Sequence, residues 1–266
     1  MRGHRLRPDP SLNPDHPGSG ASPAQRAAGW LASLAVISCP MPLLGQAAML
    51  LLFDVVQDAI PEHDDWHTHE HLPERLSIPG FLRGTRWVAP NGQPRYFVLY
   101  EVEQLATLTS DAYLERLNNP SPWTSKMMPN YRDMARGFCS VAGSFGFGMG
   151  HASLLIRFSP AKETGSSLRK WLLQDTLPQL PSRRGIGSVH LFVGALTPQM
   201  TNEQRIRGAD GTVDWALLVT GYSQDALASL MQVDLGNAQL EIHGATGVHG
   251  AMYRMEYSIT QREVDA

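Results

Sequence analysis

The chain has 266 residues, of which 42% are hydrophobic and 18% are charged, and its formal net charge is −3. This composition provides enough apolar side chains for a buried core and excludes a mostly disordered chain. The weakly acidic balance argues against a broad nucleic-acid-binding surface, which needs clustered positive charge. Cys39 and Cys139 lack the spacing of a zinc site or a disulfide framework, so we expect reduced thiols in a cytoplasmic protein.

Residues 1–48 differ in character from the rest of the chain. Residues 1–22 are rich in Pro, Gly, Ser and Arg without apolar periodicity, which is typical of disorder. Residues 27–48 are small and apolar, and three interpretations stay open: a dispensable upstream extension, a cleaved export signal and a functional tail. Prolines interrupt this stretch too early for a membrane span of about 20 apolar residues. We therefore expect no membrane segment and a folded part that begins at Met49.

Beyond Met49 the hydrophobic pattern alternates between strand and helix periods. Pro61 is a favourable first-turn residue, and Pro79-Gly80 ends the first helix. The order of elements is that of a βαββαβ ferredoxin-like unit. The predicted elements are a strand at 49–56, a helix at 61–78, strands at 81–89 and 95–102, helices at 111–117 and 123–136, and a strand from 138 into a glycine-rich run.

The same order of elements then repeats in the second half. The predicted elements are a strand at 152–158, a helix at 166–177, strands at 187–195 and 213–222, a helix at 224–233 and a strand at 250–259, with an apparent insertion near 197–207. Three features of the first half recur 105 residues later: Trp66 as Trp171, Leu72-Pro73 as Leu177-Pro178, and Gly80 as Gly185. A common spacing is the signature of an internal repeat.

These observations predict an α+β fold made of two tandem ferredoxin-like βαββαβ repeats, residues 49–150 and 151–266, after the extension at 1–48. Two such units in one chain can place their sheets face to face and close an intrachain eight-stranded α/β barrel with a cavity between the sheets. We expect either a monomeric pseudo-dimer or a homodimer. The glycine-rich run at 143–150 precedes a strand rather than a helix, so we interpret it as the joint between the halves and not as a nucleotide-binding loop.

Histidines are concentrated in the first predicted helix. It carries four of the ten: His63, His67, His69 and His71. Helical periodicity places His69 on the apolar face with Leu72 and Leu76, and it places His71 at the flank of that face. Three interpretations stay open. The polar side is a solvated helix surface with His69 as a core histidine, or a histidine moves a proton on a bound molecule, or a metal ion is bound. The metal ligands would be either His63, His67 and His71 or His67, His71 and Glu70.

The sequence around this helix resembles a known family. Trp66, His71-Leu72-Pro73 and Pro79-Gly80 resemble the W…H-x-P…P-G signature of EthD-type proteins in the dimeric α/β-barrel superfamily. That superfamily includes muconolactone isomerases, antibiotic-biosynthesis monooxygenases and polyketide cyclases. The resemblance covers residues 49–102 by motif and implies that His71 takes the place of a recurrent helix histidine. Members usually build the barrel from two chains, whereas this chain carries both halves.

The two halves differ where chemistry is expected. At the spacing of 105 residues, His67 and His71 correspond to Leu172 and Thr176, so the second half lacks the histidines. We therefore expect a single asymmetric site in the first half. Strand alternation puts Arg83 and Arg86 on opposite faces, so one of them would face the cavity and hold an anionic or enolate-like group.

The sequence thus predicts a small-molecule enzyme that performs cofactor-independent proton transfer, of isomerase, cyclase or dehydratase type, on an aromatic or polyketide-like substrate. The expected partner is a small organic ligand, with neither nucleic acid nor a membrane. Alternatives are a non-catalytic ligand-binding or accessory protein and a haem- or metal-dependent monooxygenase-like enzyme, so no cofactor is assigned while haem or a divalent metal is left open. The catalytic candidates are His71, His69 and Arg83, and the substrate-binding candidates are His67, Glu70, Arg86, Tyr96, Tyr100 and Trp123.

Overall fold

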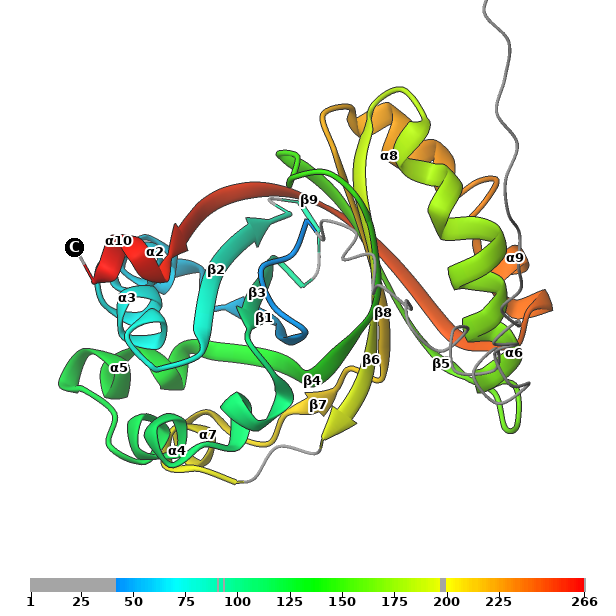
Figure 1. The fold of residues 1–266 in the computed structure, drawn as a ribbon. Helices are drawn as coiled ribbons and strands as arrows, with labels where there is room; N and C mark the ends of the chain where they lie inside the picture. Colours follow the sequence, from blue (N-terminus) through cyan, green and yellow to red (C-terminus); the bar gives the residue numbers. More distant parts are fainter. Residues whose placement is uncertain (1–41, 90, 93, 197–199, 266) are drawn as a thin grey trace, which may run out of the picture. The chain divides into compact units, whose positions relative to one another are not determined.

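Eight antiparallel strands close into a barrel in this computed structural model, which describes residues 42–89, 91–92, 94–196 and 200–265 (Figure 1). Their order is β1-β3-β2-β9-β5-β8-β6-β4, and pairing of β4 with β1 completes the ring. A two-residue strand, β7 (Gly211–Thr212), pairs in parallel with β4. The barrel strands are β1 (Ala47–Val55), β2 (Phe81–Val88), β3 (Tyr96–Val102), β4 (Tyr131–Gly146), β5 (Ala152–Pro160), β6 (Ile186–Leu196), β8 (Trp215–Gly221) and β9 (Ala245–Thr260).

The first half contributes neighbouring strands in the order β4-β1-β3-β2, and the second half contributes β9-β5-β8-β6. In both, the fourth strand lies beside the first, and the third lies between the first and the second. The two fourth strands, β4 and β9, are 16 residues long, and each pairs with its own half and with the other. The predicted α+β barrel is confirmed. Most of the predicted extension at 1–48 lies outside the described residues, and β1 begins at Ala47 rather than at Met49.

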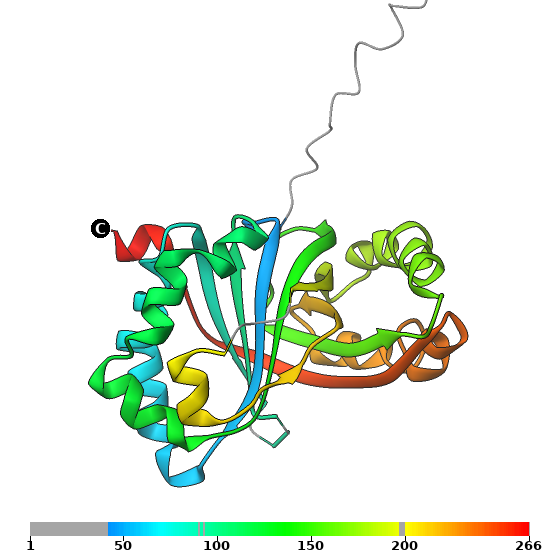
Figure 2. The ribbon, with the colours of Figure 1, turned by 90° about the horizontal axis from the view of Figure 1, so that it is seen from below.

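Helices cover the outer surface of the barrel (Figures 1 and 2). The segment α7 and the C-terminal α10 lie with the helices of the first half, because α7 contacts α4 and η5 and α10 contacts α3. In the first half these elements are η2 (Gln57–Ala59), α2 (Ile60–Trp66), η3 (His67–His71), α3 (Leu72–Leu76), η4 (Leu105–Thr109), α4 (Asp111–Asn118), α5 (Pro122–Met127) and η5 (Met128–Asn130). In the second half they are α6 (Gly165–Lys170), η6 (Trp171–Thr176), η7 (Leu177–Ser182), α7 (Asn202–Arg207), α8 (Gln224–Leu230), α9 (Asn237–Ile242) and α10 (Gln261–Val264).

One predicted helix is much shorter than expected. The sequence predicted a helix at 123–136, but α5 ends at Met127 and β4 begins at Tyr131. Pro129 explains the difference, because proline cannot donate the backbone hydrogen bond that would continue the helix. The chain therefore turns at η5 and enters the barrel.

A π turn interrupts the long helix of each half at the same place. The N–H of Leu72 donates to the carbonyl of His67, and the N–H of Leu177 donates to the carbonyl of Leu172. The residue that follows is a proline in both halves, and it has no N–H for the ordinary bond to the residue four positions back. The wider turn adds one residue, which rotates the helix faces before and after it by about 100° relative to each other.

Side chains fill the interior of the barrel. Large residues such as Leu50, Trp87, Phe97 and Phe192 point inward and are buried. An eight-stranded barrel is just wide enough for its own side chains. A ligand cavity between the two sheets therefore stays a prediction, and the cavity lined by the histidines of the first half lies outside the barrel. None of the described helices has the length and apolar character needed to cross a membrane.

Candidate functional site

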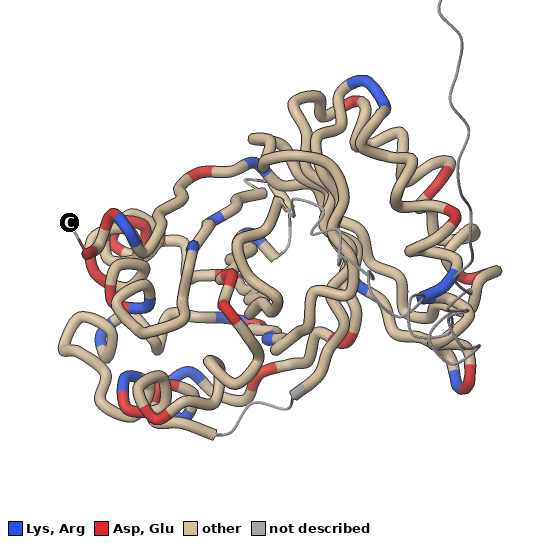
Figure 3. The backbone as a smooth tube through the Cα atoms, viewed as in Figure 1, with Lys and Arg blue, Asp and Glu red and all other residues tan. Residues whose placement is uncertain are grey.

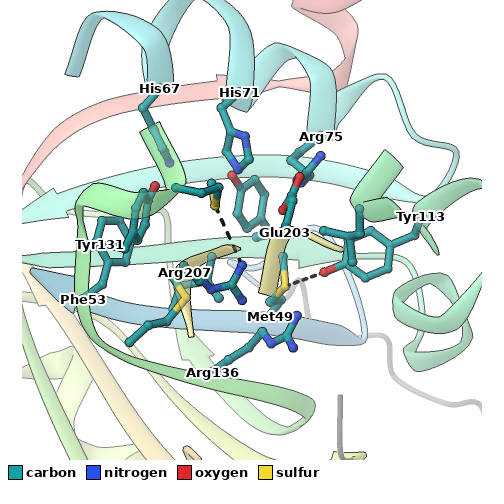
Figure 4. A pocket seen from close by; sticks show the side chains of 15 residues that line it. Met49, Phe53, His67, His71, Arg75, Tyr113, Tyr131, Arg136, Glu203 and Arg207 are labelled. Carbon is teal, nitrogen blue, oxygen red and sulfur yellow. Dashed lines mark hydrogen bonds and ion pairs between the residues drawn. The ribbon is translucent and has the colours of Figure 1, made fainter. Parts of the chain in front are cut away.

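A cavity lies between the sheet of the first half and the helices that cover it (Figure 4). It encloses about 400 Å³ of space that atoms do not fill, part of it open to solvent. Its floor is formed by β1 and β3, its roof by the helix at 60–76, and one side by α7 from the second half. The lining residues are Met49, Leu51, Phe53, His67, His71, Arg75, Tyr100, Tyr113, Leu117, Met128, Tyr131, Met134, Arg136, Glu203 and Arg207.

The helix at 60–76 presents His63, His67, His71 and Arg75 to the sheet, four residues apart in each case. All four are buried, and His67, His71 and Arg75 point into the cavity (Figure 4). His69 is exposed instead, with its Nδ1 2.9 Å from the carbonyl of Asp65. The prediction of a buried His69 is wrong. It assumed one unbroken helical period through His69, Leu72 and Leu76, but the two leucines lie beyond the π turn. The rotation at that turn moves His69 outward and brings His67 inward.

His67 is held by neighbours behind the cavity. Its Nδ1 lies 3.4 Å from Nη1 of Arg86, which also donates to Glu256 and to the carbonyl of Asp64. An arginine has no acceptor, so Nδ1 accepts and the proton of the neutral ring is on Nε2. Burial lowers the pKa of His67 well below its ordinary value, and the nearby His63, His71 and Arg86 lower it further. His67 is therefore a neutral hydrogen-bond donor at neutral pH.

His71 is the most available base in the cavity. Its ring packs 4.4 Å from the ring of Trp66, and its buried Nδ1 has no hydrogen-bond partner among the described residues. Burial and the positive charge of Arg75 lower the pKa of His71 well below the ordinary value. Perturbed histidines in a cavity are candidates for proton transfer. A neutral imidazole with a free nitrogen can accept a proton from a bound molecule.

Ion pairs fix the arginines of the cavity. Arg75 Nη2 donates to Glu203 Oε1 at 2.5 Å, and Nη1 donates to Glu74 Oε2 at 3.2 Å. Burial alone would lower the pKa of Arg75, but these two carboxylates raise it above the ordinary value. Arg207 is paired through both Nε and Nη2 with Asp210, and Arg136 Nε lies 3.0 Å from the same carboxylate. These ion pairs hold the guanidinium groups in place beside the cavity.

Two hydroxyl groups complete the polar lining. The hydroxyl of Tyr100 is buried and has no hydrogen-bond partner within the described part of the chain. Burial raises the pKa of Tyr100 well above its ordinary value, so the phenol is protonated at neutral pH. The hydroxyl of Tyr131 lies 3.2 Å from His63 Nε2, and burial raises the pKa of Tyr131 as well. His63 Nδ1 donates to Asp64, so its Nε2 accepts the proton of Tyr131, and Tyr100 is the phenol that can donate to an oxygen that gains negative charge.

The helix α7 brings residues of the second half into this site. It occupies part of the insertion that the sequence indicated near 197–207. Asn202 anchors it to the end of α4, since its side-chain amide donates to the carbonyl of Asn118 at 2.7 Å. Glu203 and Arg207 then reach the cavity (Figure 4). Sequence reasoning noticed the insertion but missed these residues, together with Arg136, because their positions depend on contacts between the halves.

Among the predicted site residues, His67, His71 and Tyr100 line the cavity and the others do not. Arg83 donates to both carboxylate oxygens of Glu101 at 2.6 and 3.0 Å, on the face of the sheet that lies inside the barrel. Neither Arg83 nor Arg86 lines this cavity, although Arg86 contacts His67. Strand alternation places the two arginines on opposite faces of the sheet as predicted, and the cavity lies on the outer face.

Glu70, Tyr96 and Trp123 have structural partners outside the cavity. Glu70 accepts hydrogen bonds from Trp66 and from Ser121, which ties the helix to the start of α5. Tyr96 donates to Asp64 at 2.8 Å. Trp123 donates from Nε1 to Glu62 at 3.2 Å and is only partly buried. These contacts hold the helix at 60–76 over the cavity, so the three residues have a structural role.

Metal ligands were one of the open interpretations. Across the described residues, no three His, Cys, Asp or Glu side chains are grouped so that they could hold a metal ion. His63, His67 and His71 share one helix face, but His63 is engaged with Asp64 and Tyr131. The charges around the cavity are shown with the rest of the chain in Figure 3.

Known proteins resemble this chain in fold but not in sequence. No family model matches the sequence, and no curated protein matches it. An anthrone oxidase-like protein matches the structure with a TM-score of 0.57 and 10% identity over 83% of this chain and 95% of that chain. Putative monooxygenases from Fusobacterium nucleatum subsp. nucleatum ATCC 25586 and Lactobacillus acidophilus NCFM match with TM-scores of 0.52, at 9% and 8% identity, over 82% and 81% of this chain and 96% of theirs.

The similarity includes both halves, because neither half alone amounts to 83% of the chain. The fold is therefore shared with these proteins, and the α/β barrel expected from the sequence is confirmed. Identities near 10% carry no information about the reaction, which has to be argued from the side chains.

Proposed function

We propose that this chain is a small-molecule enzyme that moves a proton at a carbon atom of an aromatic or polyketide-like substrate, in the cavity of the first half and without a cofactor. The observation that carries the proposal is the pair of buried, neutral histidines, His67 and His71, beside charged guanidiniums in a cavity. Buried polar groups of this kind cost stability, and they are concentrated where function requires them.

His71 serves as the base in this proposal. Its pKa lies below the ordinary value because of burial, so the ring is unprotonated at neutral pH and its Nδ1 is not occupied by a protein donor. A carbon acid bound below the ring would lose its proton to His71, and the same group would return the proton at another atom in an isomerisation or cyclisation. Tyr100 donates to the oxygen of the resulting enolate or phenolate, and the nearby Arg207 stabilises its charge.

The walls of the cavity favour such a step. Apolar side chains, Met49, Leu51 and Phe53, form its floor, and α7 closes one side. Exclusion of water strengthens the electrostatic effect of the arginines on a developing negative charge. His67 is a donor through Nε2 and adds a second hydrogen bond for the substrate.

The halves of the barrel take the places that two chains occupy in a dimeric barrel. We infer that residues 49–150 and 151–266 are tandem repeats, since both show the same strand order and a π turn followed by Leu-Pro. A chain of this kind closes its barrel alone and has one catalytic half.

The proposal is tested by proton exchange with solvent. The full chain is incubated in D2O with carbon acids of graded size, namely cyclic 1,3-diketones, 1-naphthol and anthrone, and deuterium incorporation is followed by NMR. We expect exchange that His71→Gln slows by about 10²- to 10⁴-fold, the usual contribution of general acid–base catalysis. His69→Gln is the matched control, because His69 is on the same helix but exposed, and it should leave exchange unchanged.

Equal exchange by wild type and His71→Gln would overturn the proposal. A ligand that co-purifies and is released unaltered, without exchange of any compound in the series, would favour a container role instead. Oxygenation is a second candidate, favoured by the fold similarity to proteins described as anthrone oxidase-like and as monooxygenases. It begins with the same proton removal and is recognised by consumption of O2 with anthrone.

A further inference from the structure

Two buried guanidiniums share one carboxylate at the side of the cavity formed by α7. Arg207 donates to Asp210 from Nε at 3.0 Å and from Nη2 at 2.8 Å, and Arg136 Nε lies 3.0 Å from the same Asp210. The side chains of all three are between 2% and 6% exposed. Arg136 Nη2 donates a hydrogen bond to a neutral group, Oε1 of Gln204 at 3.1 Å.

The ion pairs of Arg75 have the opposite imbalance. Glu203, a carboxylate of the cavity lining, is paired with Arg75 at 2.5 Å, and Arg75 has Glu74 as its second partner. The three guanidiniums of the cavity therefore face three carboxylates in all, and the excess of positive charge is local to the group of Arg136, Asp210 and Arg207. An unpaired charge in a buried site costs several kcal/mol of free energy unless a partner of opposite sign is present.

Hydrogen-bond donors in the cavity also exceed acceptors. Arg207 Nη1 reaches only the thioether of Met128, at 4.0 Å, and sulfur is a weak acceptor. The hydroxyl of Tyr100 has no partner in the described part of the chain. His67 contributes a further donor through Nε2. This arrangement lacks an acceptor group with negative charge.

We propose that the cavity binds an organic monoanion with a planar oxyanion, a carboxylate or a phenolate, which pairs with Arg207 and Arg136. The position of the ligand beside His71 rests on the proposed function, whereas the binding of an anion by the arginines does not. Because Arg207 is on α7, the insertion in the second half determines which substrates the first half accepts.

Binding of matched acids and amides tests the proposal. Benzoate and 1-naphthoate are titrated calorimetrically into the full chain at low salt, beside the neutral benzamide and 1-naphthamide. We expect at least one acid to bind about 10- to 100-fold more tightly than its amide, the range for a charge-assisted hydrogen bond. Arg207→Gln should remove this preference, whereas Arg169→Gln, at an exposed site of the second half, should leave it unchanged. Titration of 4-nitrophenol above and below its own pKa distinguishes phenolate from carboxylate recognition.

Equal affinity for acid and amide would overturn the inference, as would an unchanged preference in folded Arg207→Gln, or no binding of any of these anions. A far-ultraviolet circular dichroism spectrum and the melting temperature establish that each variant is folded. His71→Gln separates this inference from the proposed function, because it should retain anion binding while it loses proton exchange. Binding that depends on Arg207 without any exchange would refute the enzyme proposal alone.

Discussion

The space between sheet and helices contains a group of buried polar side chains within its apolar core in the first half, whereas the core of the second half is apolar. Both halves use the same scaffold, so residues 105 positions apart can be compared. In the second half this space is filled by a continuous apolar core. The corresponding pairs are Met49 and Leu154, His63 and Leu168, His67 and Leu172, His71 and Thr176, and Arg75 and Leu180.

The strands show the same contrast. Arg136 and Gly250 occupy equivalent register positions, opposite Leu51 and Ile156 respectively. A Cβ added at Gly250 would lie 2.2 Å from the terminal carbon of Met231, the far end of a flexible side chain that can move. The second half therefore carries no side chain where the first half carries a guanidinium. The comparison teaches that this scaffold can be built with apolar residues in place of the histidines, so the proposed function gives the polar residues of the first half a role.

The largest expected effect of a single change concerns Asp210. Asp210→Asn leaves two buried guanidiniums without a carboxylate, and we expect the free energy of unfolding to fall by about 3–5 kcal/mol. Arg207→Gln leaves Arg136 paired one-to-one with Asp210 and should cost less than half as much. Urea unfolding at pH 7 measures both. A larger cost for Arg207→Gln would contradict the charge excess that the anion proposal requires.

His67 and Leu172 occupy equivalent positions, and we expect substitutions there to change the free energy of unfolding by very different amounts. Leu172→Ala opens a cavity in a packed core and should lower the free energy of unfolding by about 2–5 kcal/mol. His67→Leu copies the residue of the second half, and we expect a change of less than about 1 kcal/mol, because similar-sized apolar residues often replace buried polar ones without loss. Thermal and urea unfolding give both values. A cost for His67→Leu equal to that of Leu172→Ala would mean that the polar half is needed for folding.

Stability should depend on pH through the buried histidines. The pKa values of His67 and His71 are lowered by burial, so below about pH 6.5 the unfolded chain binds protons that the native chain does not. Stability is complete above that pH and falls as the pH decreases toward the lowered pKa values, by up to about 1.4 kcal/mol per pH unit for each histidine.

Unfolding of the double variant His67→Gln, His71→Gln between pH 7 and pH 5 measures this contribution. The slope of its free energy of unfolding against pH should be smaller than that of wild type, by the equivalent of up to two bound protons. His190 remains as an internal reference, since burial lowers its pKa to about 3 inside the barrel. An unchanged pH dependence in the double variant would show that the two rings are protonated in the native protein.

The smallest effect is expected at Thr176, the counterpart of His71. It is partly buried and carries none of the hydrogen-bonded contacts found for the first half. Thr176→Ala should change the free energy of unfolding by less than about 0.5 kcal/mol and leave proton exchange intact. Proton exchange that depends on Thr176 would place chemistry in the second half and remove the asymmetry.

Much of the architecture could be predicted because it is encoded locally. Apolar runs such as that at Met49 and the breaks at Pro79-Gly80 identify the strands and the end of the first helix. The spacing of 105 residues between Trp66 and Trp171 indicated the repeat. Among the candidate residues, His71 was ranked first through a motif, and it lines the cavity.

The phase of the long helix could not be read from its pattern. A single period over 61–78 assigned His69 to the buried face, and the π turn before Pro73 divides the helix into two segments with different phases. The signal was present, since Leu-Pro follows the turn in both halves, but its effect on the faces depends on the backbone hydrogen bonds that form.

The sequence by itself determined most of the strands and helices, their order, and the contrast between the histidine-rich first helix and its counterpart without histidines at 166–177, because these depend on hydrophobic pattern and residue identity. Only the tertiary structure decided that the barrel interior is filled, that the cavity lies outside it, and that Arg207 of the second half reaches His71 of the first. Closure of a barrel and the reach of an inserted helix depend on contacts between residues far apart in sequence. No local pattern records those contacts.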